Sequence, residues 1–308
     1  MFVSDEGPAI EVSDLWKCYG SHAAVRGIDF EVAHGEVFGI LGPNGAGKTT
    51  TVEILEGFRE RTDGDVRVLG IDPSRQPLEL RRRLGVVPQD GGLPGELSVS
   101  EVVDAFRRYY AAPLPTDELL QLVELTSVRK QRVKSLSGGQ RRRVDIAVAL
   151  AGDPDLVFLD EPTTGFDPAA RRRAWGVIRD LAATGKTVVL TTHYMEEAQA
   201  VCDRVALLVS GQIVAEGDPA ALGTSVGPSR ITFLRPPVRT SLEGLDSVGA
   251  VHAEGPVITI EVTDPVDALR SLLSWSHRRQ VALRSLSVTP PTLEDTYLRL
   301  TEDCVVGS

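Results

Sequence analysis

The segment VFGILGPNGAGKTT (37–50) is the strongest indication of the fold of this chain, because it joins a continuous aliphatic run to a glycine-rich loop. The run VFGIL (37–41) is typical of a parallel strand that is covered on both faces. The loop matches the pattern G-x-x-x-x-G-K-[ST], which cradles phosphate groups between a strand and a helix. Glycines let backbone N–H groups turn toward phosphate oxygens, and the following helix adds its positive end. We therefore expect a phosphate-binding site at the end of this strand.

Two residues of this loop carry specific chemistry. We expect Lys48 to reach the β- and γ-phosphates of a nucleotide, and Thr49 to offer its hydroxyl to Mg²⁺. A glycine-rich turn that only begins a helix is the alternative, and it is disfavoured because Lys and Thr are both in register. The candidate nucleotide-binding residues of the loop are Gly42, Pro43, Asn44, Gly45, Ala46, Gly47, Lys48, Thr49 and Thr50.

Further along the chain, LVFL (156–159) and TVVLTT (187–192) are also nearly continuous aliphatic runs. LVFL ends in Asp160 and Glu161, at the carboxyl edge of a buried parallel strand, where ligands of open α/β sheets collect. Asp160 suits an outer-sphere ligand of Mg²⁺, and Glu161 suits the base that polarises an attacking water. The alternative is a solvated turn, which a neighbouring phosphate loop makes less favourable.

A second anion-binding helix start is predicted at LSGGQ (136–140), which is followed directly by RRRVDIAVAL. A Ser-Gly-Gly turn that opens into a helix presents backbone N–H groups and the positive end of the helix dipole. The candidate binding residues are Ser137, Gly138, Gly139 and Gln140. One chain has one phosphate loop, so two phosphate-binding ends make sense if they meet across two chains.

With GPNGAGKT, LSGGQ and FLDEP in this order, residues 1 to about 221 resemble the nucleotide-binding subunit of an ATP-binding-cassette (ABC) transporter. The resemblance implies an α/β P-loop NTPase cassette: a mixed sheet core, an antiparallel β subdomain and an inserted helical subdomain. It also implies ATP and Mg²⁺ as cofactors, and an ATPase that closes as a head-to-tail homodimer on two ATP molecules.

The resemblance assigns roles to further positions. Tyr19, in KCYG, matches the aromatic residue that stacks on adenine. Gln89, in VVPQD, matches the glutamine that reaches Mg²⁺ and the water and couples to the membrane subunit. His193 matches the histidine that contacts the γ-phosphate, and Asp167 matches the aspartate that bridges the two chains. A core tyrosine, a loop amide and a polar strand cap are the plain alternatives. The implied catalytic residues are Glu161, His193, Gln89 and Lys48.

The remaining segments predict the domain organisation. IEVSDL, IDFEV and DVRVLG alternate as strands of an antiparallel sheet, and VALLV-SGQ-IVAEG predicts a closing hairpin. Glu, Arg, Leu and Ala at helical spacing through 79–150 predict an inserted helical region, placed at about 90–150. The predicted domains are 1–221, the ATPase, and 222–308, a small α+β domain that follows the linker GTSVGPS.

In the second domain, RITFL and VITIEV alternate as strands, a helix is predicted near 264–278, a strand near 281–288 and a last helix after Pro290 and Pro291. The ending PTLEDTYLRLTED, with EPTTGFDP, resembles daunorubicin-resistance exporters, whose ATPase pairs with a separate membrane permease. Thr292, Glu294 and Asp295 could equally be a plain helix cap. No catalysis is assigned to this domain.

Composition limits the class of protein and the partners that this chain could have. The 308 residues, with 42% hydrophobic and 25% charged residues, are typical of a folded globular chain. Lys and Arg number 33 against 43 Asp and Glu, and the charge of −10 disfavours a nucleic-acid partner. Three distant cysteines favour a reducing cytosol over disulfides or a zinc site. No stretch approaches the length of an apolar membrane span, so we expect a peripheral subunit held at the cytoplasmic face of the membrane by its permease.

The function predicted from the sequence is the ATPase subunit of an exporter of a drug, antibiotic or lipid-like compound. A soluble ABC ATPase in translation or DNA repair is one alternative, but those proteins carry two cassettes or a long coiled coil. The ATPase subunit of an importer is a second. A nucleotide-sensing scaffold without activity is a third, which Glu161 and His193 disfavour.

Overall fold

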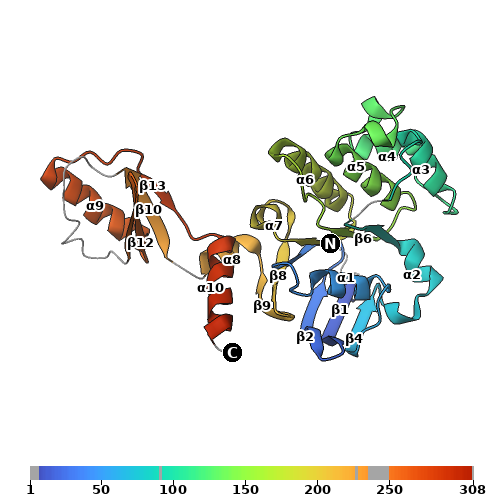
Figure 1. Ribbon diagram of the computed structural model, residues 1–308, viewed down its shortest axis with the longest axis horizontal. Coiled ribbons are helices and arrows are strands. Elements are labelled where there is room, and N and C mark those ends of the chain that lie inside the picture. The colour runs from blue at the N-terminus through green and yellow to red at the C-terminus, as the bar shows by residue number, and fades with distance from the viewer. Residues whose placement is uncertain (1–6, 90–91, 226–227, 235–249, 307–308) are drawn as a thin grey trace. The chain divides into compact units, whose positions relative to one another are not determined.

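The computed structural model describes residues 7–89, 92–225, 228–234 and 250–306. The chain divides into two units, Met1–Pro219 and Ala220–Ser308. The division lies two residues before the boundary expected from the sequence. The first unit contains two sheets and two apolar clusters, and the second contains one sheet and one apolar cluster (Figure 1).

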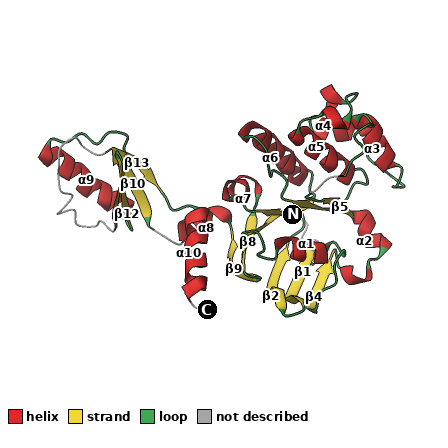
Figure 2. Ribbon diagram, viewed as in Figure 1, coloured by secondary structure: helices red, strands yellow, loops and turns green. Residues whose placement is uncertain are grey.

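Six strands form the central sheet of the first unit, in the order β5-β6-β7-β3-β8-β9. The first five are parallel, and β9 pairs antiparallel with β8 (Figure 2). The predicted strands at 37–41, 156–159 and 187–192 are confirmed, and so is the closing hairpin. The strands are β3 (Val37–Leu41), β5 (Leu84–Val87), β6 (Leu156–Asp160), β7 (Thr187–Thr192), β8 (Arg204–Val209) and β9 (Gln212–Gly217).

The antiparallel sheet predicted from alternating residues is also confirmed. It has the order β2-β1-β4, formed by β1 (Ile10–Tyr19), β2 (His22–Val32) and β4 (Asp63–Val68). The Phe30 ring of β2 stacks on the Phe38 ring of β3, with the ring centroids 5.4 Å apart. This contact joins the antiparallel sheet to the central one, and the β1–β2 hairpin brings Tyr19 to its turn.

Two apolar clusters cover the two faces of the central sheet. Successive side chains of a strand point to opposite faces, so Val157 and Leu159 enter one cluster and Phe158 enters the other. The first cluster includes residues of α5 and α6, and the second includes residues of α1 and the antiparallel sheet. Burial on both faces explains why these strands read as continuous aliphatic runs.

Along the chain, the helices of the first unit alternate with these strands. Three of them, α3, α4 and α5, fall within the predicted insertion at about 90–150. The helices are α1 (Lys48–Leu55), α2 (Leu78–Arg83), α3 (Val99–Arg107), α4 (Thr116–Leu122), α5 (Gly138–Ala149), α6 (Pro168–Ala183) and α7 (Met195–Val201), with short 3₁₀ turns at Pro73–Arg75, Thr126–Val128 and Val133–Ser135.

The helical interpretation of 79–150 is wrong at residues 84–87. LGVV forms β5, a parallel edge strand that pairs with β6 from Leu84↔Leu156 to Val87↔Leu159. Four apolar residues are too short to reveal a period, and pairing with a strand 72 positions away decides their conformation. This strand matters for function because it ends two residues before Gln89.

In the second unit, β11 (Val251–Glu254), β12 (Val257–Val262), β10 (Ser229–Leu234) and β13 (Ser287–Thr289) form an antiparallel sheet in that order. Helix α9 (Pro265–Arg279) packs Leu272 and Trp275 on this sheet. The predicted α+β content, the two alternating strands and both helices are found, and β11 was not foreseen. The expected strand near 281–288 is limited to 287–289, because Val281 and Leu283 pack against the core instead.

Two further helices belong to this part of the chain, α8 (Pro219–Ser225) and α10 (Leu293–Val306). Helix α8 covers residues 223–225 of the expected linker, of which 226 and 227 lie outside the described residues. The Thr296 hydroxyl donates to the Leu222 carbonyl at 3.0 Å. Thr292 and Asp295 cap α10 reciprocally, and Arg230 pairs with Asp295. The plain cap interpretation of Thr292 and Asp295 therefore accounts for both side chains.

Candidate nucleotide-binding site

The loop between β3 and α1 has a backbone that only glycine allows at two points. Gly47 has φ +107°, and a Cβ there would lie 2.4 Å from the Ala24 carbonyl oxygen. A Cβ on Gly42 would lie 2.2 Å from the Leu208 carbonyl oxygen. Strand β2 of the antiparallel sheet and strand β8 of the central sheet therefore both lie close against the loop, and the close fit holds it at the start of α1.

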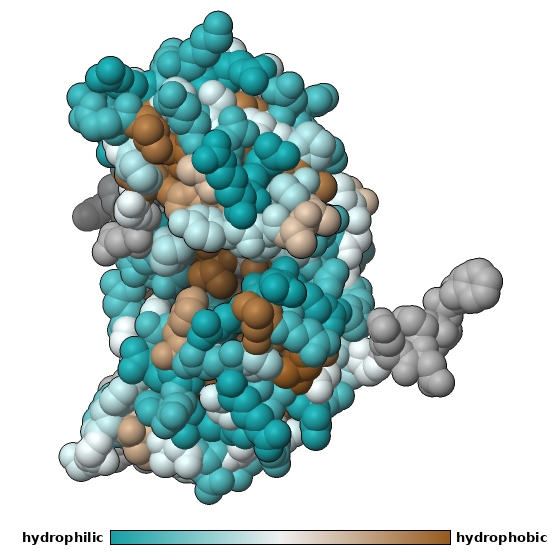
Figure 3. All heavy atoms as spheres, turned by 90° about the vertical axis from the view of Figure 1, so that its right-hand side faces the viewer, coloured by the Kyte–Doolittle hydropathy of each residue, from teal (hydrophilic) through white to brown (hydrophobic). Residues whose placement is uncertain are grey.

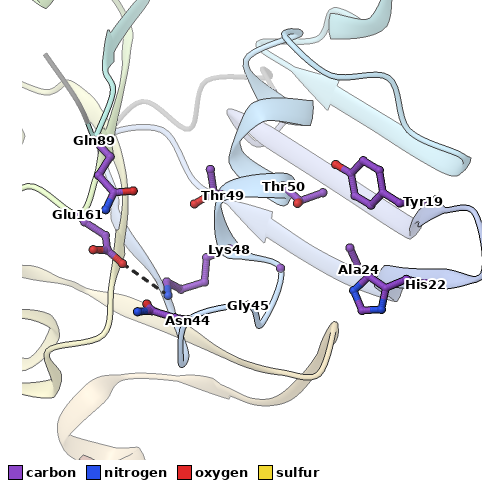
Figure 4. A pocket seen from close by; sticks show the side chains of 11 residues that line it. Tyr19, His22, Ala24, Asn44, Gly45, Lys48, Thr49, Thr50, Gln89 and Glu161 are labelled. Carbon is purple, nitrogen blue, oxygen red and sulfur yellow. Dashed lines mark ion pairs between the residues drawn. The ribbon is translucent and has the colours of Figure 1, made fainter. Parts of the chain in front are cut away.

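Lys48 lies inside this loop with 5% of its side chain exposed. Its Nζ donates to the carbonyl oxygens of Gly42, at 2.9 Å, and Pro43, at 3.2 Å. The same Nζ is 3.7 Å from Glu161 Oε1, the ion pair drawn in Figure 4. Burial lowers the pKa of Lys48, while the charges of Glu161 and Asp160 act in the opposite direction. The ammonium group is thus placed among acceptors that an anion could replace.

Strands β6 and β7 lie side by side and bring the carboxylates together with His193. Thr191 donates its hydroxyl to Asp160 Oδ1, and the Glu161 backbone N–H donates to the same hydroxyl at 3.0 Å. His193 Nδ1 is 3.3 Å from Glu161 Oε1. Glu161 has φ +46°, a left-handed conformation that costs free energy in a non-glycine residue. Parallel pairing therefore fixes the Glu161 side chain between Lys48 and His193.

A cavity of about 490 Å³ opens beside Lys48 and Glu161 (Figure 4), and the predicted residues Asp160 and His193 are not among those that line it. Gln89 and Glu161 lie at one end, Tyr19 and His22 at the other, and the phosphate loop lies between them. Sequence reasoning missed His22, which lies on the far side of the β1–β2 turn from Tyr19. The lining residues are Tyr19, His22, Ala24, Asn44, Gly45, Gly47, Lys48, Thr49, Thr50, Gln89 and Glu161.

Tyr19 has 41% of its surface exposed, an unusual state for a large aromatic residue beside a cavity. Lys17 Nζ lies 5.1 Å from the ring centroid, and Arg59 Cζ lies 5.3 Å from it. The ring is therefore available to a planar ligand, and two cations lie near it.

The remaining predicted residues lie outside this cavity. Ser137 and Gln140 form a capping box at the start of α5: the Gln140 N–H donates to Ser137 Oγ at 3.2 Å, and the Ser137 N–H donates to Gln140 Oε1 at 3.0 Å. Asp167 caps α6 by accepting from the N–H groups of Ala169 and Ala170 at 2.9 Å. These N–H bonds lower the pKa of Asp167. The structure does not bring these groups to the phosphate loop of their own chain.

A buried carboxylate behind the site was also missed. Glu197 is fully buried, and its Oε1 accepts from the Thr163 hydroxyl at 2.8 Å and from Trp175 Nε1 at 3.1 Å. Burial raises its pKa. Glu197 therefore ties the segment after Glu161 to α6 and α7, and YMEEAQ after a buried strand was the only signal in the sequence.

The candidate metal ligands suit magnesium. Among the described residues, no group of three His, Cys, Asp or Glu side chains could hold a metal by itself. Thr49, Gln89 and Asp160 supply a hydroxyl, an amide and a carboxylate. Mg²⁺ prefers few protein ligands, with phosphate oxygens and waters completing an octahedron. The donor set fits an ion that arrives with a nucleotide.

In the part of the chain that the structure describes, no helix is both long enough and apolar enough to cross a membrane. The face shown in Figure 3 is mostly hydrophilic, with hydrophobic residues in small groups.

Comparison with known proteins points to one family. The family model described as "ABC transporter" matches residues 25–164, and "ABC transporter domain-containing protein-like, C-terminal domain" matches residues 229–292. Nod factor export ATP-binding protein I of Paraburkholderia xenovorans is 40% identical over 95% of this chain and 97% of its own length. Daunorubicin resistance ATP-binding protein DrrA3 of Streptomyces coeruleorubidus is 36% identical over 96% of each chain.

Solved structures agree with the sequence relatives. The dimeric ATP-binding cassette MJ0796, in a post-hydrolysis state with ADP and Pi, is 27% identical, covers 68% of this chain and 98% of its own, and has a TM-score of 0.61. CbiO1 from Clostridium perfringens, part of the ABC transporter complex cbiONQ, is 29% identical, covers 70% and 91%, and has a TM-score of 0.64. The phosphate loop, the strand-end carboxylates and a 40% identical relative of nearly equal length place this chain in the ABC transporter family, as an ATP-hydrolysing, ATP-binding subunit.

Proposed function

We propose that this chain binds ATP with Mg²⁺, closes as an ATP-induced head-to-tail homodimer on two nucleotides, and powers export through a separate integral-membrane permease. The observation that carries the proposal is that the predicted nucleotide-binding residues fall into two groups, one that lines the cavity and one that lies away from it. Lys48, Gln89 and Glu161 line one cavity, whereas the Ser137–Gln140 segment and Asp167 lie outside it. A second copy of the chain would supply the missing groups.

In this proposal the adenine stacks on Tyr19 and the phosphates lie in the loop around Lys48. Lys48 leaves the carbonyl oxygens of Gly42 and Pro43 and pairs with the β- and γ-phosphates. Its departure from Glu161 frees that carboxylate to accept a proton from water, and His193 contacts the γ-phosphate. Mg²⁺, held through Thr49, Gln89 and Asp160, would neutralise phosphate charge. The chemistry needs positioned charges and no covalent nucleophile.

The proposal of a dimer rests on the number of anion-binding segments in each chain. Each chain has one phosphate loop and one helix start at Ser137–Gln140, and the latter presents N–H groups and a positive helix end. A head-to-tail pair gives each nucleotide one of each. The solved relative MJ0796 is described as dimeric with ADP and Pi, which supports this arrangement.

Export through a permease is supported by the relatives' names. They are export and resistance ATP-binding proteins that match this chain over nearly its full length. We propose that the cargo is a drug, antibiotic or lipid-like compound, and that the subunit lies peripherally at the cytoplasmic face of the membrane, held by its permease. The net charge of −10 gives no support to a nucleic-acid partner.

The test is Glu161→Gln, because an amide cannot accept the proton from water. Loss of a general base removes about 10²–10⁴ in rate, while ATP binding and dimerisation should persist. Phosphate release and ATP-dependent dimerisation measure the two effects. Glu196→Gln is the control, since Glu196 is an exposed carboxylate on α7 that does not line the cavity. Turnover by Glu161→Gln above roughly a tenth of wild type would contradict the assigned base.

A further inference from the structure

Arg142, on helix α5, is a buried charged residue to which the proposed chemistry gives no role. Its side chain is 7% exposed, and it lies two residues after Gln140. Its Nη1 donates to the Pro88 carbonyl oxygen and, at 3.4 Å, to that of Gln89. Its Nη2 donates to the Asp160 carbonyl oxygen. One guanidinium therefore contacts both the loop that carries Gln89 and the end of β6.

These contacts require arginine chemistry. A buried charge is costly unless it is hydrogen-bonded, and the planar guanidinium can donate to several carbonyl oxygens in a fixed geometry. The lysine ammonium is a compact point charge on a flexible stem and cannot span the two segments in the same way. Asp145, one turn along α5, has its pKa raised to about 6 by burial, an effect that the charge of Arg142 opposes.

The helix supplies the mechanical link. Helix α5 runs without interruption from Gly138 to Ala149, and its N-cap is Ser137. A hydrogen-bonded helix moves as a unit, so the position of Ser137–Gln140 and the position of the Arg142 guanidinium are linked. The guanidinium in turn holds the backbone at Pro88, Gln89 and Asp160, next to the side chains predicted to bind the metal and the water.

We infer that Arg142 is a positioning residue: it fixes the Gln89 loop and the Asp160–Glu161 turn to the helix that begins at Ser137. The inference rests on the proposed function, because it takes the roles of Gln89, Asp160 and Glu161 from it. When a nucleotide on the partner chain engages Ser137–Gln140, α5 transmits its position to the site of its own chain. Arg142 contributes to turnover without touching the nucleotide.

The neighbouring residue is a matched control. Arg143 is 8% exposed, lies on the same helix, and donates to the carbonyl oxygens of Val123, at 3.1 Å, and Glu124, at 3.2 Å. It also donates to Glu124 Oε2 at 3.3 Å. All three acceptor atoms belong to the helical region, and none lines the cavity. Arg143→Lys therefore reproduces the loss of a buried guanidinium on α5 but leaves the Gln89 loop and Asp160 in contact with Arg142.

The first measurement separates turnover from binding in the full chain. Arg142→Lys should lower kcat about 10- to 100-fold, the usual effect of losing a partner that orients a ligand. The Kd for ATP should stay within about twofold, because the phosphate loop is unchanged. Arg143→Lys should lose a comparable amount of thermal stability and keep its kcat. The inference would be overturned if Arg142→Lys kept the kcat of wild type. It would also be overturned if Arg142→Lys and Arg143→Lys lowered kcat equally.

The second measurement is hydrogen exchange with and without ATP, in the Glu161→Gln background. With Arg142 present, ATP should protect residues 84–89 and 138–149 together. With Arg142→Lys added, residues 48–55 should keep their protection while 84–89 and 138–149 no longer respond together. Retained joint protection contradicts the positioning role even if kcat falls. If Arg142→Lys does not fold, Arg142→Gln takes its place in both measurements. A wild-type chain without ATPase activity would instead contradict the proposed function.

Discussion

Lys48 and Glu161 form a buried ion pair. Their side chains are 5% and 9% exposed, and the N–O distance of 3.7 Å is an ion pair without a short hydrogen bond. The hydrogen bonds of Lys48 Nζ go mainly to two carbonyl oxygens of the phosphate loop. In the proposed function, an arriving triphosphate would exchange these partners for charged ones, which form stronger hydrogen bonds. On that proposal, the pair compensates both charges before a nucleotide binds.

Tyr19→Ala should weaken ATP binding. Base–aromatic stacking contributes about 1–3 kcal/mol, or about 5- to 150-fold in affinity. Tyr19→Phe should change little, because the ring is retained. Tyr109→Ala is the control, since Tyr109 is 84% exposed and does not line the cavity. Titration calorimetry measures the affinities, and an unchanged Kd for Tyr19→Ala would place the adenine elsewhere in the cavity.

Glu56, at the C-terminal end of α1, should make the stability of the nucleotide-free chain depend on pH. Burial raises its pKa to about 8, and the nearby charges of Asp160 and Glu53 act in the same direction. The folded chain therefore keeps a proton on Glu56 that the unfolded chain, in which the glutamate pKa has its ordinary value of 4.5, releases. The contribution of Glu56 to the free energy of unfolding is fully present below pH 4.5. It is lost progressively as the pH rises from 4.5 through 8.

Glu56→Gln should remove this dependence. Urea unfolding at pH 6 and pH 9, about the middle of the window from 4.5 to 8 and just above its upper end, should show a smaller loss of stability in Glu56→Gln than in wild type. Glu60→Gln is the control, because Glu60 is an exposed carboxylate at the surface. Parallel losses in wild type and Glu56→Gln would show that another group titrates.

Helices α3 and α5 begin with the same capping box but serve different purposes. Ser98 and Glu101 cap α3, and Ser137 and Gln140 cap α5. Each cap satisfies N–H groups that the first turn of a helix leaves without partners. On α5, the hydroxyl and the amide are also the groups predicted to reach a nucleotide on the partner chain. Binding there must therefore compete with the cap.

Ser98→Ala and Ser137→Ala should cost similar stability, about 1 kcal/mol each, as other N-cap replacements do. Only Ser137→Ala should lower turnover, by about tenfold or more, because a hydrogen bond to a charged phosphate is lost. Differential scanning calorimetry and phosphate release measure the two effects. If Ser98→Ala slows turnover as much as Ser137→Ala, helix stability alone explains the result.

The composite site makes a prediction for the whole assembly. A dimer of a Lys48→Ala chain with a Ser137→Arg chain gathers both defects in one site and leaves the other intact. A dimer of wild type with a chain that carries both substitutions has one defect in each site. The first dimer should trap ATP at one site, and the second should not.

Differently tagged chains, purified as mixed dimers and assayed for trapped nucleotide, test this order of activity. Homodimers of each single variant should trap no nucleotide, because both of their sites carry the defect. If the dimer of wild type with the double variant traps ATP and the complementing dimer does not, each site is built within one chain. The head-to-tail arrangement would then be wrong.

Much of the fold and of the cavity could be predicted from the sequence, because the decisive groups are contiguous. GPNGAGKT carries its own glycines, lysine and threonine, and Asp160 and Glu161 end a strand whose burial is visible in LVFL. Alternating residues likewise predicted the antiparallel sheet. These features depend on local backbone geometry and on the period of a strand, both of which a short segment specifies by itself.

The distant residues that support those groups could not be predicted from the sequence, because they meet only when the chain packs. Residues 84–87 are a strand because β6 pairs with them, and Thr191 reaches Asp160 because β7 lies beside β6. Arg142 and Glu197 acquire acceptors and donors from segments tens of positions away. No local pattern marks such residues, since a buried polar side chain is defined by the partners that packing brings to it. Short contiguous segments therefore specify the chemistry at the strand ends, whereas packing between distant segments holds that chemistry in place.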